Sequence, residues 1–184
     1  VTGFKNGETL ASATSGAFVF ASDATAASGV GQYRVDVSGL TSASGNYVFT
    51  QDVANAMALT VSPATLTVTA GNAAKTYDGQ AFVGGSTLTY AGFRNDETAA
   101  VLGGSVSYTG TSQGAVNAGA YAITPSGLSA ANYTLSYASG TLTVNKAALT
   151  LTGADATREY GAADPAFSAT LTGFVNGEDF TMAG

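Results

Sequence analysis

A seven-residue motif occurs three times, and this recurrence constrains the fold more than any other feature of the sequence. Its copies read GFKNGET (3–9), GFRNDET (92–98) and GFVNGED (173–179). The phenylalanines Phe4, Phe93 and Phe174 are therefore 89 and 81 residues apart. LTVSPATLTVT (59–69) also returns as LTVNKAALTLT (142–152), an offset of 83. This period is that of a whole domain and is much longer than the period of a solenoid repeat.

The repeats can be phased from the strand pattern around residue 140. YTLSYASGTLTV (133–144) reads as two alternating strands, Tyr133 to Tyr137 and Thr141 to Val144, joined by a short turn that contains glycine. A new alternating run begins two or three residues later. We place domain joints at Ser62-Pro63 and at Asn145-Lys146, because proline cannot donate to a strand ladder and fits a boundary.

This phase divides the chain into three segments. Residues 1–63 are the C-terminal part of a first repeat, 64–146 a complete repeat and 147–184 the N-terminal part of a third. They are called the first, middle and third segments below. The rival phase starts each repeat at the GF motif and gives 1–91, 92–172 and a short remainder. Val1 is not a usual first residue, so we expect the chain to be a piece of a longer protein.

Strand signals dominate each repeat. Thr65, Thr67 and Thr69 alternate with Leu66 and Val68, the pattern of a half-buried strand. Further strands are predicted at 81–93, at 104–110 and at 119–125, the last ending at Pro125. Six or seven strands with regular turn signals favour tandem Ig-like β-sandwich repeats, arranged as an elongated rod. The alternative is a β-grasp-like unit, in which a short helix ending near Val101 and capped by Asn95 or Asp96 crosses the sheet.

Composition excludes several classes of function. Only 10% of the 184 residues are charged, and the net charge is -6, which argues against binding to nucleic acid or to an anionic membrane surface. The chain has no histidine and no cysteine, and so lacks the commonest general base, thiolate nucleophiles and disulfides. No run of apolar residues approaches the length of a membrane span. We predict no enzyme activity, no cofactor and no metal.

The stretch KTYDG (75–79) is the strongest candidate for a site. As a site, Lys75, Tyr77 and Asp78 would form a catalytic cluster, in which Asp78 would be a base or a calcium ligand. As structure, Asp78-Gly79 is a turn signal that follows a strand. REYGAADPAF (158–167) repeats the cation and Tyr160 but has Gly161 in place of Asp78. We therefore predict a turn that fixes a tyrosine and in which the acid is optional.

The GF motif offers a second candidate. In the middle segment it contributes Phe93, Asn95 and Glu97, and in the third Phe174 and Asn176. Its oxygen ligands are too sparse for a calcium loop, so a turn or a helix cap is the preferred interpretation. The neighbouring acids Asp96-Glu97 and Glu178-Asp179 do not imply the facing carboxylates of a glycosidase.

Three other patterns have structural explanations. The T-x-T runs are solvent-facing strand residues and are too widely spaced for ice binding. Lys5, Lys75 and Lys146 could form Lys-Asn isopeptide bonds, but no catalytic acid can be assigned from the sequence. Aromatic residues recur at matched positions, among them Tyr121 and Tyr133, as core residues do. Any exposed ones could form a platform for sugars.

Together these motifs, with NAGAY (117–121), ANYTLSY (131–137) and GTLTV (140–144), resemble the MBG/YDG family of tandem domains. This family occurs in large bacterial surface and secreted adhesins, including filamentous-haemagglutinin-like proteins. The third segment resembles the YG subtype and the middle segment the YDG subtype. The resemblance implies a stalk or spacer module of an exported adhesin, with no catalytic residue to carry over.

We therefore expect a non-catalytic structural spacer, secreted or associated with the outer membrane at the bacterial cell surface, that presents a distal binding region in cell adhesion or biofilm formation. The alternative is an adhesive module that binds host or matrix glycans or proteins through exposed tyrosines or sheet edges. The expected partners are neighbouring repeats of the same chain. Head-to-tail self-association by strand complementation is a further expectation.

Overall fold

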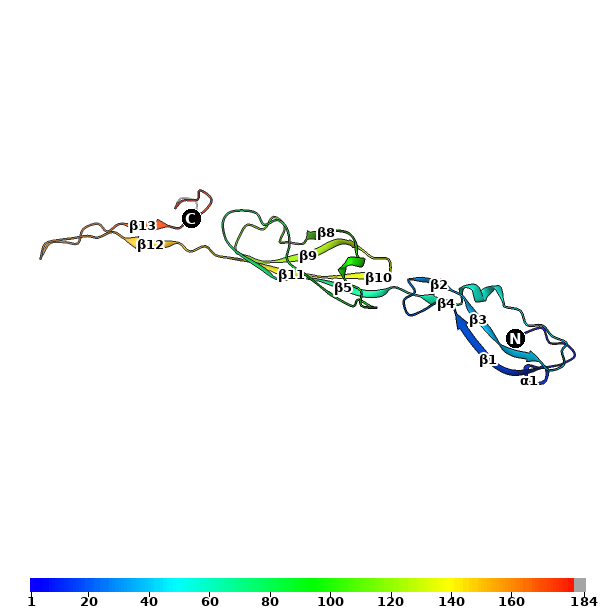
Figure 1. Ribbon diagram of the computed structural model, residues 1–184. Coiled ribbons are helices and arrows are strands. Elements are labelled where there is room, and N and C mark those ends of the chain that lie inside the picture. Colours follow the sequence, from blue (N-terminus) through cyan, green and yellow to red (C-terminus); the bar gives the residue numbers. More distant parts are fainter. Residues whose placement is uncertain (181–184) are drawn as a thin grey trace. The chain divides into compact units, whose positions relative to one another are not determined.

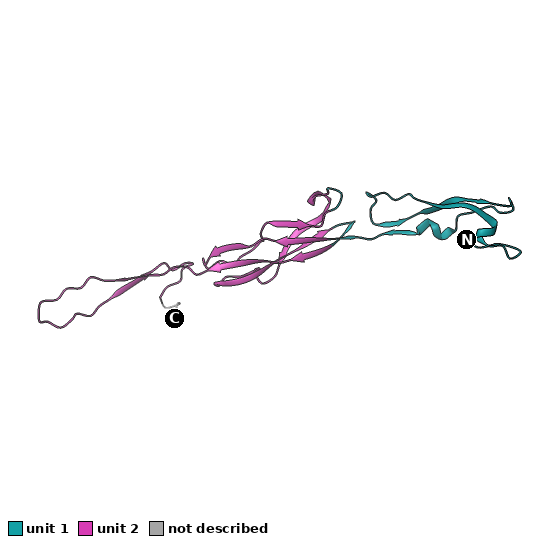
Figure 2. Ribbon diagram, turned by 90° about the horizontal axis from the view of Figure 1, so that it is seen from below, with its two compact units in different colours: residues 1–65, 94–96, 130–134 teal, residues 66–93, 97–129, 135–184 magenta. Residues whose placement is uncertain are grey.

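The computed structural model describes residues 1–180, which form a mainly β protein with short helical turns (Figure 1). Its contacts divide it into two compact units (Figure 2). Unit 1 contains residues 1–65, 94–96 and 130–134, and unit 2 contains 66–93, 97–129 and the chain from 135 onward. The predicted β class is confirmed.

The elements of the first segment are α1 (Leu10–Ala13), β1 (Thr14–Ser22), β2 (Gly31–Tyr33), β3 (Val35–Ser42), the 3-10 helix η1 (Val53–Met57) and β4 (Leu59–Val61). Those of the middle segment are β5 (Ala64–Ala70), β6 (Ala73–Thr76), β7 (Leu88–Ala91), η2 (Ala99–Val101), β8 (Gly103–Thr109), β9 (Gly119–Ser129), β10 (Tyr133–Ala138) and β11 (Gly140–Asn145). The third segment has β12 (Thr150–Gly153) and β13 (Ala169–Thr172).

The middle segment is a two-sheet sandwich. One sheet has the strand order β10-β5-β7 and the other has the order β6-β11-β9-β8, in which β6 and β11 run parallel. Ala70 of β5 packs in one buried cluster with Ile123 of β9 and with Leu142 and Val144 of β11. The core therefore joins the two sheets. The alternating pattern of β5 explains this, since Leu66 and Val68 are fully buried while the threonines between them are not.

The β-grasp alternative does not fit this arrangement. The only helical element between 64 and 146 is η2, a three-residue 3-10 turn. Its cap is Thr98, whose side chain accepts a hydrogen bond from Ala100 N–H. The prediction that Asn95 or Asp96 caps a helix is wrong, because both have left-handed backbone angles, φ 52° and 57°, and belong to the preceding turn.

Three strand predictions also need correction. Residues 133–144 are not a hairpin: β10 and β11 lie in different sheets, and only Ser139 separates them. At the crossing, a Cβ on Gly140 would lie 2.1 Å from the Gly71 carbonyl oxygen, so glycine is required there. Strand β9 does not end at Pro125 but runs on to Ser129. Its pairing with β11 stops at Ile123, so from Pro125 onward β9 pairs only with β8 and has a free edge, where a proline is tolerated. In the region 81–93, only Leu88–Ala91 is a strand.

Paired glycines place the same bulge in the first and middle segments. A Cβ on Gly39 would lie 2.1 Å from the Ala17 carbonyl oxygen, and one on Gly127 would lie 2.3 Å from that of Ser105. Both glycines have positive φ, and the strand registers shift at the two sites between Gly16 and Val19 and between Gly104 and Ser107. This explains why the SGL motif recurs at 38–40 and 126–128.

The first and third segments contain fewer strands than the middle one. The first has the two-stranded ladders β1-β3 and β2-β4, and the third has the ladder β12-β13. In the buried apolar core recorded for residues 1–180, the only member from the first segment is Ala13, and none comes from the third. Both segments therefore expose apolar positions that the middle segment buries.

Candidate functional site: the contact between the Tyr77 and Phe174 turns

The turn after β6 holds Tyr77 at the end of the sandwich. Strand β6 stops at Thr76, and the Tyr77 backbone N–H donates to the Asn145 carbonyl oxygen at 2.7 Å. Asp78 then accepts from the Gln80 N–H at 2.9 Å, and Gly79 adopts φ 70°. This hydrogen bond is the Asx turn that Asp-Gly sequences favour. The half-buried Tyr77 side chain packs against the core of the sandwich.

The acid of this turn forms an ion pair. Lys75 Nζ lies 2.7 Å from Asp78 Oδ1 and also donates to the Gln80 carbonyl oxygen at 2.8 Å. The hydrogen bond from Lys75, together with the one from Gln80 N–H, holds the pKa of Asp78 below its ordinary value. Lys75 and Asp78 therefore stabilise the turn.

The corresponding cation of the third segment also has an acid partner. Arg158 Nε lies 2.7 Å from Asp164 Oδ1, and an Arg158 guanidinium nitrogen donates to the Ala162 carbonyl oxygen at 3.2 Å. Arg158 is therefore also paired with an acid, although the position that matches Asp78 holds Gly161. Gly161 takes φ 85°. Tyr160 is fully exposed, unlike Tyr77.

The GF motif forms the same turn in all three segments. Asn6, Asn95 and Asn176 have φ between 52° and 54°, and the residues that follow them, Gly7, Asp96 and Gly177, also have positive φ. The Glu8 N–H donates to the Lys5 carbonyl oxygen and the Glu178 N–H to that of Val175, both at 3.0 Å. Two consecutive left-handed residues inside such a hydrogen bond make a type I′ turn.

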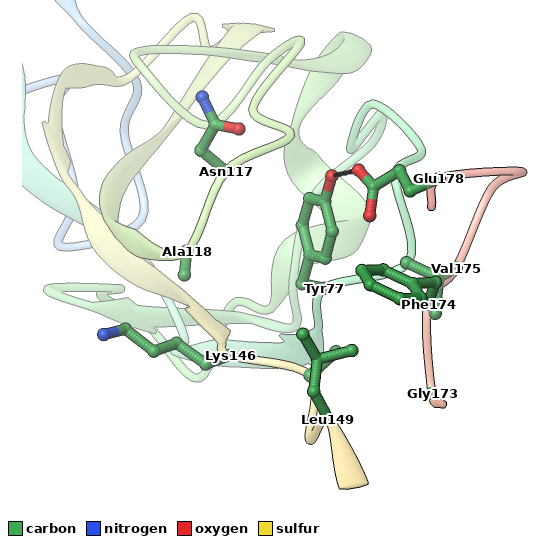
Figure 3. Close-up of a pocket in the computed structure, with 10 residues that line it drawn as sticks. Tyr77, Asn117, Ala118, Lys146, Leu149, Gly173, Phe174, Val175 and Glu178 are labelled. Carbon is green, nitrogen blue, oxygen red and sulfur yellow. Dashed lines mark hydrogen bonds between the residues drawn. The ribbon is translucent and has the colours of Figure 1, made fainter. Parts of the chain in front are cut away.

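The Phe174 turn contacts the Tyr77 turn within unit 2 (Figure 3). The Tyr77 hydroxyl donates to a Glu178 carboxylate oxygen. Gln80 Nε2 donates to Asn176 Oδ1 at 2.8 Å, and Asn176 Nδ2 donates to the Gly79 carbonyl oxygen at 3.3 Å. Three side-chain hydrogen bonds therefore connect residues about a hundred positions apart. Figure 3 shows the Phe174 ring beside Tyr77, at a groove of about 340 Å³ that Asn117 and Lys146 also line.

Glu178 controls the protonation of Tyr77. The hydrogen bond to the carboxylate raises the pKa of the Tyr77 hydroxyl, and partial burial and the charge of Glu178 act in the same direction. A tyrosine with a raised pKa is neither a nucleophile nor a base near neutral pH. The contact therefore acts as a structural hydrogen bond.

The first segment has a related contact inside unit 1. The Tyr47 hydroxyl donates to Glu8, and the Lys5 N–H donates to the Tyr47 hydroxyl oxygen at 3.1 Å. The rings of Phe4 and Tyr47 meet edge to face at 5.7 Å. As at Tyr77, the carboxylate raises the pKa of Tyr47. In the middle segment the Arg94 N–H likewise donates to the hydroxyl of the buried Tyr133, at 2.9 Å.

A second set of contacts, also inside unit 1, links the first segment to loops of the middle one. Asn95 Nδ2 donates to the Ala26 carbonyl oxygen at 3.3 Å. Asn132 accepts the Val30 N–H through Oδ1 at 2.9 Å, and its backbone oxygen accepts the Ala64 N–H at 3.0 Å. Asn95 and Asn176 thus occupy the same motif position, and each bonds to a preceding segment.

A tyrosine that recurs in GQY (31–33) and GAY (119–121) fixes the loop at each of these places. Tyr33 donates its hydroxyl hydrogen to the Gly29 carbonyl oxygen at 2.7 Å, and Tyr121 donates to that of Asn117 at 2.8 Å. Both bonds run back four residues, as in a tyrosine corner. They fix the loops that contain Val30 and Ala118, and Ala118 lines the groove beside Phe174.

Across residues 1–180 no group of three or more acidic, histidine or cysteine side chains is placed to hold a metal ion. Within the same range no helix is long and apolar enough to cross a membrane. Asp96 is exposed on its turn, while the neighbouring Glu97 is half-buried. The site residues hold turns and tyrosines in place.

Sequence reasoning found the turns but not their partners. Gln80 and Glu178 were not singled out as joint residues, although both belong to segments that recur. The signal available in the sequence was the recurrence of one glutamate in the GF motif, as Glu8, Glu97 and Glu178, in a chain with few charges. The structure shows that this glutamate is half-buried each time, and a half-buried acid requires a donor.

The recurring turns and tyrosine contacts define a class of protein built from repeated β domains. The chain belongs to the MBG domain family: a family model described as the MBG domain (YGX type) matches residues 1–57, 66–143 and 149–184. The middle segment, which we expected to resemble the YDG subtype, matches the YGX-type model as the others do. No curated protein and no solved structure matched the chain.

Proposed function

We propose that the chain is a non-catalytic spacer of an exported bacterial adhesin, in which the three segments are consecutive repeats and hold a distal binding region away from the cell. The family supports this proposal, since MBG domains are typical of repeats in surface adhesins. A spacer requires each repeat to resist unfolding and each joint to resist bending. The middle segment meets the first requirement through its buried core.

The contact between the Tyr77 and Phe174 turns carries the proposal. Val144 of β11 is buried, and only a short connection separates this strand from β12. Asn176 accepts a hydrogen bond from Gln80 and donates one to the Gly79 carbonyl oxygen, and Tyr77 donates to Glu178. These three bonds fix the GF turn of the third segment against the middle one. A short connection with a second point of attachment restricts domain rotation much more than a single covalent link does.

An array of glycans and matrix proteins tests this function against the adhesive alternative. The 184-residue chain is probed over increasing concentrations, with Tyr160→Ser as a variant because Tyr160 is the fully exposed tyrosine. A spacer gives no saturable binding, and the variant behaves as the parent does. Saturable binding to one class of glycan or protein that Tyr160→Ser abolishes would contradict the spacer function and establish an adhesive module.

A further inference from the structure

The GF turn of the third segment contains a pair of residues with a chemistry of its own. Among the asparagines of the chain, only Asn6 and Asn176 precede a glycine. The amide carbon of an asparagine side chain can be attacked by the backbone nitrogen of the next residue. Glycine at that position favours the attack most, because it has no side chain to hinder the approach and the freest backbone. Asn176 and Gly177 are both exposed to the water that such a reaction needs.

The contact with the Tyr77 turn holds the Asn176 side chain on both sides of its amide. Asn176 Oδ1 accepts from Gln80 Nε2 at 2.8 Å, and Asn176 Nδ2 donates to the Gly79 carbonyl oxygen at 3.3 Å. A Cβ on Gly79 would lie 2.7 Å from Asn176 Cγ, so the amide carbon packs directly against the backbone of residue 79. The amide carbon is free to move only when this contact opens.

The type I′ turn also keeps the two reacting atoms apart. Ring closure requires Asn176 Cβ and the Gly177 nitrogen to lie on the same side of the Cα–C bond of Asn176. In a type I′ turn the first central residue has ψ of about 30°, which places these two atoms on opposite sides of that bond. Asn176 and Gly177 have φ 53° and 74°, as this turn requires. The folded turn is therefore protected, and the reaction proceeds through its opening.

The middle segment has the same asparagine but a different residue after it. Asn95 Nδ2 donates to the Ala26 carbonyl oxygen at 3.3 Å, just as Asn176 Nδ2 donates to that of Gly79. Asp96 follows Asn95 and has φ 57°, a left-handed angle that glycine would adopt with less strain. The Cβ of Asp96 hinders attack on the Asn95 amide. Two turns that make the same kind of contact thus differ in the reactivity of their asparagine.

We propose that Asn176 is a site of spontaneous deamidation and that the reaction releases the contact between the Tyr77 and Phe174 turns. The Gly177 nitrogen loses its proton and forms a bond to Asn176 Cγ, while the bond from Cγ to Nδ2 breaks and ammonia leaves. Water then opens the cyclic imide at either carbonyl carbon and leaves aspartate or isoaspartate. Nothing is oxidised or reduced in these steps. The proposal concerns the chemistry of this contact and does not rest on the spacer function.

Neither product fits the contact. A carboxylate has no hydrogen to donate, so the bond to the Gly79 carbonyl oxygen is lost and two acceptor oxygens face each other. Isoaspartate also adds a carbon atom to the backbone of the turn from which Glu178 reaches Tyr77. Asn95 keeps its amide over the same period, because Asp96 slows the attack. The joint after the middle segment therefore ages, while the joint before it does not.

Peptide mapping of the 184-residue chain tests the reaction during incubation at mildly alkaline pH. The aspartate and isoaspartate at position 176 are measured over time, in the folded chain and in urea. Gln80→Ala removes one bond to Asn176, and the Gln80 side chain is exposed, so the core stays intact. Asn176 should react more slowly in the folded chain than in urea. Gln80→Ala should accelerate it in the folded chain by roughly two- to tenfold, the effect of one hydrogen bond on the opening equilibrium.

Gln32→Ala is the matched control, because Gln32 is exposed on β2 and its side chain makes no hydrogen bond within residues 1–180. This variant should leave the rate at Asn176 unchanged. Asn6 is the internal reference in every sample, since it lies in the same kind of turn and precedes a glycine. Gln80→Ala should not alter its rate. Equal rates at Asn176 in the folded chain and in urea, or no effect of Gln80→Ala, would overturn the proposal, as would deamidation of Asn95 as fast as that of Asn176.

Spin labels on Thr141→Cys and Thr170→Cys test whether the product releases the contact. The distribution of distances between the labels should broaden as the chain ages, in step with the isoaspartate content at position 176. Gly177→Asp gives the third segment the pair of residues that the middle segment has, and its distribution should stay narrow. A narrow distribution in the fully deamidated chain would overturn the release of the contact. A distribution already broad before ageing, or equal broadening in Gly177→Asp, would overturn it as well.

Discussion

Tyr77 donates its hydroxyl hydrogen to Glu178, a residue 101 positions further along the chain. The tyrosine comes from the turn that ends β6, and the acid comes from the GF motif of the third segment. In the first segment the same motif acid, Glu8, accepts from Tyr47. The motif glutamate is therefore an acceptor for a tyrosine hydroxyl, and at residue 178 it connects two segments.

The buried core of the middle segment should dominate its stability. Leu142→Ala should lower the free energy of unfolding by about 2–5 kcal/mol, because it leaves a cavity beside Ile123 and Val144. Leu59→Ala, at the matching position of the first segment, should cost about 1 kcal/mol or less, since that side chain is already exposed. Urea denaturation followed by tyrosine fluorescence measures both. Equal losses would contradict the different burial of the two leucines.

The type I′ turn of the middle segment contains a residue that suits its backbone poorly. Asp96 has φ 57°, where the first and third segments have glycine. Asp96→Gly should raise the free energy of unfolding by about 0.5 kcal/mol. The substitution relieves the strain of a left-handed aspartate, and this gain is larger than the entropy cost of placing glycine in the folded chain. Ala100→Gly, outside any left-handed position, should instead destabilise by about 0.5–1 kcal/mol. Thermal unfolding of the two variants gives the signs, and a loss for Asp96→Gly would contradict the turn.

The Lys75–Asp78 pair should make stability depend on acid pH. The folded-state pKa of Asp78 is lowered, so its contribution is present above roughly pH 4 and is lost as the pH falls through the folded value. Asp78→Asn should remove this part of the acid dependence of stability. Denaturation midpoints measured at several acid pH values compare the parent and the variant. An unchanged pH profile in Asp78→Asn would show that the pair contributes nothing.

The Tyr77–Glu178 bond should have the opposite pH dependence. The folded-state pKa of Tyr77 is raised, so the bond contributes fully below roughly pH 10 and is lost as the pH rises through the folded value. Glu178→Gln removes the charge, and Tyr77 should then ionise at lower pH. The absorbance of tyrosinate during an alkaline titration, with Tyr77→Phe to assign the signal, measures the change. Tyr47 keeps Glu8 and serves as the internal reference.

The sequence predicted local features well because they depend on neighbouring residues. The alternation of β5, the turn at Asp78-Gly79 and the recurrence of the GF motif are all short-range patterns, and each has a counterpart in the structure. The motif turn itself was assigned less accurately. Asn95 was a candidate helix cap, and only its left-handed φ shows that it belongs to a type I′ turn.

Features that depend on the path of the chain were not predictable. The stretch 133–144 has the spacing of a hairpin, and only the close approach of Gly140 to Gly71 shows that the chain crosses to the other sheet. The partner of Tyr77 was unpredictable for the same reason, since nothing near residue 77 indicates Glu178. Asp164, the acid that pairs with Arg158, was not predicted because it lies three positions beyond the residue that aligns with Asp78.

The distance distribution between two spin labels across the Tyr77–Glu178 contact shows whether this contact holds the third segment against the middle one. Cysteines that carry the labels replace the exposed Thr141 of β11 and Thr170 of β13. Double electron–electron resonance is recorded for the labelled parent, for the double variant Tyr77→Phe/Asn176→Ala and for the control variant Tyr137→Phe. Tyr137 is a suitable control because its hydroxyl bonds only to Leu128. We predict a narrow distribution in the parent and the control and a clearly broader one in the double variant. Equally broad distributions in all three would contradict a joint that these residues hold.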